Sequence, residues 1–175
     1  MKFRLMIFGL LMTVITTSRA GEEQDSLQSP VLLASEVFKQ MPDSVIPSLS
    51  VNNRLDMIDF MDSGMKAEVT NLFGKKSEML TLADDSLSLR VSDALTVHMF
   101  LLTPSEVIDS CSKVICLLRT YNLDDKMRSS ETLFFTPQWR KLSIEPHFPE
   151  TDFQRIAALN LQTILKWERE ILKKD

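Results

Sequence analysis

Three aspartates spaced three residues apart, Asp56, Asp59 and Asp62, form the cluster of this sequence best suited to binding a cation. On a helix, these steps place the carboxylates within an arc of about 120°, near enough to share one ion. Calcium sites, however, usually add backbone carbonyls from an irregular loop, and no Asp-x-Asp-x-Asp-Gly pattern occurs here. We therefore favour the solvated side of an amphipathic helix over a calcium-stabilised domain, and we expect no metal or cofactor.

The two histidines, His98 and His147, are the candidates for proton transfer. A general base needs a hydrogen-bonded partner and a cleft for the substrate. The sequence has no Gly-x-Ser-x-Gly element, phosphate-cradling loop or dinucleotide-binding motif. A small hydrolase or ligand-binding enzyme that uses one histidine with a carboxylate is therefore the alternative function, and a partly buried sheet histidine is the simpler interpretation of His98.

The only two cysteines, Cys111 and Cys116, are close enough in sequence to raise the question of a disulfide. Five extended residues would separate their Cα atoms by about 16 Å, which is too far for a bond, so a disulfide requires a turn near Ser110–Ser112. The other interpretation is a buried Cys116 that acts as a small hydrophobic side chain. Zinc binding is disfavoured because it needs four ligands, and the only histidines, His98 and His147, lie far from the cysteines in the sequence.

Helical spacing of apolar residues predicts the elements that would position the aspartates. A first helix is expected over 34–41 and a second from Asn52–Asn53 to about Gly64, with Asp56, Asp59 and Asp62 on its polar side. The stretch 66–73 predicts a further helical piece. The tail 152–174 predicts a C-terminal helix, although residues 157–165 also alternate as a strand would.

From about residue 77 the apolar period changes from 3.6 to 2, which predicts strands. Segments 86–92, 95–101, 113–121 and 131–136 follow it, with His98 and Phe100 opposite the more apolar face of their strand. Short polar connections predict an antiparallel meander. The expected fold is α+β: N-terminal helices packed on a four- to five-stranded antiparallel meander sheet, followed by a C-terminal helix.

The first twenty residues have the layout of a secretory signal peptide. Lys2 and Arg4 precede the apolar run 5–15, and Ser18-Arg19-Ala20 offers small residues for cleavage after Ala20. We expect a flexible mature N-terminus at 21–33, a single domain at 34–175, and a periplasmic or extracellular location with no membrane span.

Cleavage would remove three basic residues and take the net charge from −4 to −7. An acidic chain argues against nucleic acid and against anionic membrane surfaces as partners.

Several segments together resemble a family of exported Bacteroidales proteins that is a domain of unknown function. They are Met41-Pro42-Asp43, Asn52-Asn53-Arg54, Asp59-Phe60, the run from Met65 to Asn71 with Phe73-Gly74 and Ser77-Glu78, and Lys113-Val114-Ile115-Cys116. The resemblance covers about residues 35–140. It implies a bacterial exported protein and carries no catalytic or binding residues. The segment 122–126 departs from the Gly-Pro turn expected there.

The order of helices and meander also resembles the module of the beta-lactamase-inhibitory-protein type and of small outer-membrane assembly lipoproteins, a likeness of fold alone. We therefore expect a non-catalytic binding module for an unidentified protein or other envelope macromolecule. His98 and Phe100 mark the expected contact surface, provided that the tail does not cover it.

Overall fold

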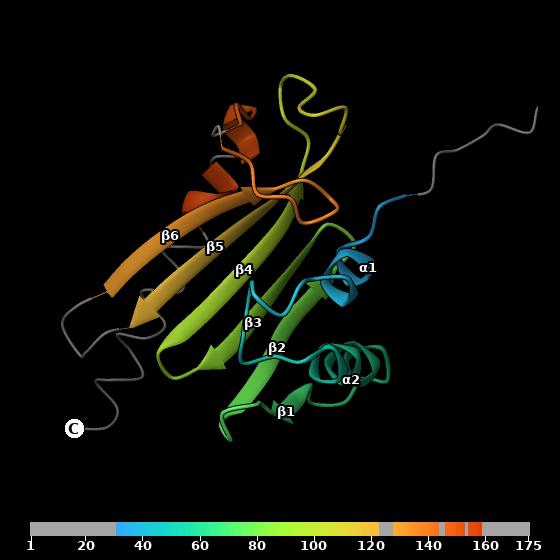
Figure 1. Cartoon of the computed structure of the whole chain (residues 1–175), viewed down its shortest axis with the longest axis vertical. Coiled ribbons are helices and arrows are strands. Elements are labelled where there is room, and N and C mark those ends of the chain that lie inside the picture. The colour runs from blue at the N-terminus through green and yellow to red at the C-terminus, as the bar shows by residue number, and fades with distance from the viewer. Residues whose placement is uncertain (1–30, 123–127, 144–145, 153, 159–175) are drawn as a thin grey trace, which may run out of the picture. The chain divides into compact units, whose positions relative to one another are not determined.

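A six-stranded antiparallel sheet forms the body of the chain in a computed structural model that describes residues 31–122, 128–143, 146–152 and 154–158 (Figure 1). Each strand pairs with the next one along the chain, which confirms the predicted α+β meander. The sheet has one strand more than the four or five expected. The strands are β1 (Glu68–Thr70), β2 (Lys76–Ala83), β3 (Ser86–Ser92), β4 (Leu95–Leu102), β5 (Val114–Asn122) and β6 (Arg128–Phe135).

The helical piece predicted over 66–73 is wrong, because these residues form β1 and the turn into β2. Val69 is buried between the more exposed Glu68 and Thr70, a strand pattern that three residues are too few to reveal in sequence. The backbone of Gly74 has a φ of +70°, which ends the short strand in a tight turn.

Two helices, α1 (Ala34–Lys39) and α2 (Val51–Asp62), lie on one face of the sheet, here called the first face (Figure 1). Helix α2 begins one residue before the expected Asn52–Asn53, because Ser50 caps it: the Ser50 hydroxyl accepts from the Asn53 backbone N–H, and the Asn53 side chain accepts from the Ser50 N–H. Alternating residues of the strands meet the helices in a large apolar core, which includes Phe38, Met57, Leu89, Met99 and Ile115.

The connection between the helices is organised by Arg54, whose side chain is only 1% exposed. Its guanidinium donates to the carbonyls of Met41 (2.6 Å) and Leu49 (2.7 Å) and to the carboxylate of Asp43 (2.8 Å). A buried charge is tolerated only with such partners, so Arg54 fixes the path of the segment 41–49.

The opposite, second face carries a smaller apolar cluster near the start of β5. Phe100, Leu102, Val114 and Cys116 form it, and Phe134, Leu142, Phe148 and Ile156 pack against it. Residues 150–152 and 154–158 are helical, in agreement with the predicted C-terminal helix, whose remainder lies outside the described residues. So do the predicted leader, 1–20, and residues 21–30. Within the ranges that the structure describes, no helix is long and apolar enough to cross a bilayer.

Candidate functional site

The aspartate row lies on the exposed side of α2, as predicted for an amphipathic helix, and Asp56, Asp59 and Asp62 are all exposed. No group of three or more potential ligands that could hold a metal ion occurs among the described side chains. The positively charged side chain of Lys39 lies near two of these aspartates. Its pKa is raised, chiefly by its hydrogen bond to Glu36 and to a lesser degree by the charges of Asp62 and Asp59.

His98 lies on the second face, where its Nδ1 is 2.8 Å from the hydroxyl oxygen of Ser88 on the neighbouring strand. Burial lowers the pKa of His98 to about 4, so the ring is neutral at neutral pH and a weak base. A hydroxyl and an imidazole are thus together, but His98 is only 5% exposed, and it does not line the hollow beside β6 or the one beside the β1–β2 turn.

Phe100 is 2% exposed, so the contact surface expected around His98 and Phe100 does not face solvent. The expectation depended on what covers the second face. Phe148 and Ile156 pack on the cluster that holds Phe100, and the Arg155 guanidinium lies 5.5 Å from the Phe100 ring centroid.

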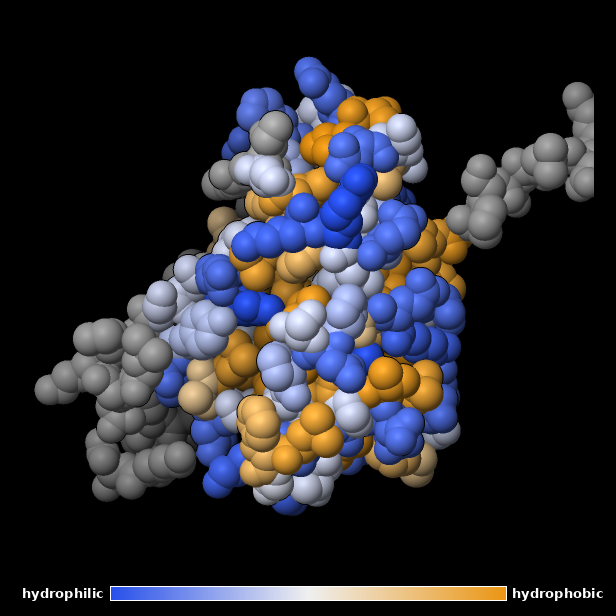
Figure 2. All heavy atoms as spheres, viewed as in Figure 1, coloured by the Kyte–Doolittle hydropathy of each residue, from blue (hydrophilic) through white to orange (hydrophobic). Residues whose placement is uncertain are grey.

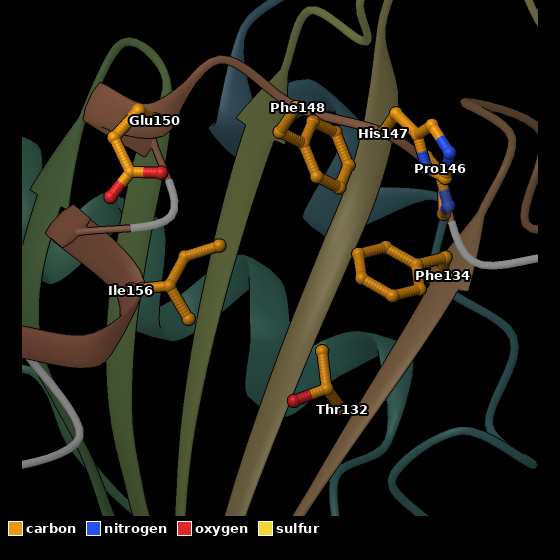
Figure 3. A pocket seen from close by; sticks show the side chains of 7 residues that line it. All are labelled: Thr132, Phe134, Pro146, His147, Phe148, Glu150 and Ile156. Atoms are coloured by element: carbon orange, nitrogen blue, oxygen red, sulfur yellow. The ribbon is translucent and has the colours of Figure 1, made fainter.

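His147 lines a hollow of about 420 Å³ between β6 and the segment that follows residue 145 (Figure 3). Phe134 and Ile156 point into this hollow, whereas His147 and Glu150 lie on either side of Phe148. Glu150 Oε1 accepts a hydrogen bond from Gln154 (3.1 Å). No hydrogen bond joins His147 to a carboxylate in the part of the chain that the structure describes, so the pair needed by a hydrolase is not assembled there.

The disulfide considered for Cys111 and Cys116 does not form. Cys116 is fully buried in the extended strand β5, opposite Phe100 and Phe134 of its neighbours. Cys111 belongs to the loop before β5, where its N–H donates to the Ile108 carbonyl (2.8 Å) and its thiol lies 3.5 Å from the Asp109 carbonyl. Cys111 therefore lies in a loop and Cys116 inside β5, three residues into the strand.

The turn between β1 and β2 exposes two large apolar side chains in succession, Leu72 (62%) and Phe73 (71%). Lys75 and Lys76 follow them and are also exposed. These four residues are called the turn surface below. In Figure 2, hydrophobic atoms gather at the lower end of the view, where this turn lies in Figure 1.

The buried side-chain amide of Asn71 holds the backbone of the turn surface in place. The Asn71 side chain, 5% exposed, accepts from the backbone N–H groups of Phe73 (3.0 Å) and Lys75 (3.1 Å), and it donates to the Ser77 hydroxyl (3.0 Å) and the Val91 carbonyl (3.3 Å). The turn is also tied to the helical layer, because the Leu72 N–H donates to the Ser48 carbonyl (2.9 Å). The backbone that carries Leu72 and Phe73 is therefore held in place by hydrogen bonds.

Sequence reasoning missed Leu72 and Phe73 because it placed them in a helix. The available signal was Asn71 followed three residues later by Gly74, a turn pattern between β-branched residues and the alternating strand from residue 77.

Comparison with known proteins gives a match between residues 27–164 and the model of a family described as "Protein of unknown function (DUF3256)". The chain belongs to this family. The predicted membership in a family of unknown function is thereby confirmed. No curated protein matches the chain.

One solved structure that resembles the chain is a domain of an uncharacterized protein from Porphyromonas gingivalis W83. It shares 24% sequence identity with a TM-score of 0.49, over 62% of this chain and 52% of that one. The matched region thus spans about half the length of that solved chain.

Proposed function

We propose that the chain is a non-catalytic binding module that recognises a partner protein through the turn surface. The observation that carries this proposal is the exposure of Leu72 and Phe73 on a turn fixed by the buried Asn71. Large apolar side chains that stay exposed in a rigid setting are typical of contact sites, because little conformational entropy is lost when they bind. Aromatic anchors of this kind often supply a large share of the binding energy.

We further propose that the module works outside the cytoplasm, on the evidence of its first twenty residues. A basic head, an apolar run and a small residue at position 20 support export with cleavage after Ala20. Export and cleavage are tested by N-terminal sequencing of the protein from fractionated cells of the organism that produces it. Gly21 as the first residue in the periplasmic or external fraction is expected, and an intact Met1 in the cytoplasmic fraction would contradict it.

The hydrolase alternative is supported by one contact, the 2.8 Å approach of Ser88 and His98. A serine needs a base that is reactive near neutral pH and open to substrate. Burial of His98 and its pKa of about 4 speak against both requirements. Binding is therefore the better supported function.

Site-specific photo-crosslinking tests the binding function. A photoreactive phenylalanine analogue replaces Phe73 in one variant and Val107 in another, because both positions are about equally exposed, at 71% and 72%. Val107 lies in the loop between β4 and β5, at the opposite end of the sheet (Figure 1). We expect a discrete adduct from position 73 alone when crosslinking is done in cells of the organism that produces the protein. Equal adducts from both positions, or none from position 73, would refute the role of the turn surface.

A further inference from the structure

A groove runs beside the turn surface, between the β1–β2 turn and the β3–β4 turn, and is called the inter-turn groove. Its volume is about 700 Å³, within the range of sites that hold a ligand or a few residues of a peptide. Residues of both turns line it, among them Phe73, Lys75, Lys76, Asp93, Ala94 and Leu95.

The apolar part of the groove comes from Phe73 together with Ala94 and Leu95. The position of Phe73 is set by the hydrogen bond from its N–H to Asn71, and Asn71 is in turn bonded to the Val91 carbonyl across the groove. The two sides of the groove are therefore joined by one buried side chain, and their spacing does not depend on a ligand.

The groove is lined by more positively charged than negatively charged side chains. Lys75 and Lys76 face it from the β1–β2 turn, and Asp93 faces it from the β3–β4 turn. Lys76 is 80% exposed although its Nζ lies 2.6 Å from Glu68, and Lys75 has no ion-pair partner among the described residues. On a chain with a net charge of −4, this wall is locally positive and favours an anionic ligand.

We infer that the inter-turn groove binds an acidic, extended peptide segment of the partner, with an apolar side chain against Phe73 and a carboxylate at Lys75 and Lys76. This inference rests on the proposed binding function and names the chemistry of its partner. Two lysines opposed by an aspartate are too few for a nucleic acid, which is bound by many phosphate contacts. They suffice to select the register of a short acidic segment.

A display library of random eight-residue peptides, selected on the purified full chain, tests the inference. Enriched peptides are expected to combine Asp or Glu with an aromatic or aliphatic residue. One such peptide, synthesised and titrated by fluorescence anisotropy, is expected to lose about tenfold in affinity in the double variant Lys75→Glu, Lys76→Glu, because attraction becomes repulsion. It is also expected to weaken with added salt.

The matched control is Lys141→Glu, which reverses an exposed lysine at the opposite end of the sheet and is expected to leave the affinity unchanged. Melting temperatures of all variants check that the fold is intact. Enrichment of peptides without acidic residues, or equal affinity in the double variant, would overturn the inference. If position 73 crosslinks a partner while no peptide is enriched, the acidic-segment inference fails and the binding function stands.

Discussion

Asn71 and His98 are buried to the same extent, each with 5% of its surface exposed, but they serve different regions of the molecule. Asn71 bonds four groups around the β1–β2 turn and so shapes an exposed surface. His98 lies in the middle of β4, and its bond to Ser88 joins two adjacent strands. Equal burial of a polar side chain therefore does not imply an equal role. The partners decide whether it organises a surface or only satisfies its own hydrogen bonds.

The largest expected effect concerns His98 and pH. Its pKa is about 4 in the folded protein, below the ordinary value of 6.5, so between these values the unfolded chain binds a proton that the folded chain does not. The free energy of unfolding should therefore fall as the pH drops from 6.5 to 4, with a His98 contribution of up to about 3 kcal/mol.

Urea titrations at several pH values measure this effect as the difference between the wild type and His98→Asn. The same substitution at the exposed His147 is the control and should keep the wild-type pH dependence. A wild-type slope that persists in His98→Asn would show that burial of this ring does not control acid stability.

The second effect is a loss of stability and of binding together in Asn71→Ala. The variant removes four hydrogen bonds and leaves buried groups without partners, so the free energy of unfolding should fall by about 2–3 kcal/mol. Crosslinking from position 73 should weaken as well. Ser88→Ala, which deletes the hydroxyl beside His98 Nδ1, should cost about 1 kcal/mol and leave the crosslink intact. Loss of the crosslink in both variants would break the distinction between the two regions.

The third effect uses two glycines with matching backbones, Gly64 (φ +68°) and Gly74 (φ +70°), where an added Cβ would meet no atom within 4 Å. Alanine at either site should cost about 1 kcal/mol, because only the left-handed backbone is strained. Thermal melts should show similar losses. Only Gly74→Ala, which alters the turn surface, should reduce the yield of crosslink from position 73.

The smallest effect on stability is expected for Phe73→Ala. Its side chain is 71% exposed, so the free energy of unfolding should change by less than about 0.5 kcal/mol, as for Val107→Ala. Affinity for the partner identified by crosslinking should fall in Phe73→Ala alone. An equal loss in both variants, measured by titration, would mean that apolar exposure by itself does not define the site.

The sequence was informative where periodicity was long and uninterrupted. The alternation in 86–92 and 95–101 placed His98 and Phe100 on the correct side of the sheet, and the spacing of 113–121 anticipated β5. The sequence could not predict which residues cover that side of the sheet, because Phe148 and Ile156 pack on the Phe100 cluster from some fifty residues away. Such contacts leave no local pattern.

The sequence did not predict the turn surface, for a different reason. β1 has three residues, fewer than any periodicity test can use, and its neighbours Lys66 and Ala67 have good helix propensity. Pairing with β2 outweighs that propensity, and the pairing is visible only once the register of Val69 with Ser77 is known. The exposure of Phe73 follows from the turn that this register creates.

The sequential strand order also has a kinetic consequence. Because each strand pairs with its successor, most loops that must close during folding are short, a topology associated with faster folding than that of sheets with distant pairings. Some contacts depart from this order, among them the bond from the Trp139 indole N–H to the Val37 carbonyl, 102 positions away along the chain. We expect the hairpins to assemble early, and this bond to form late, when α1 docks on a nearly complete sheet.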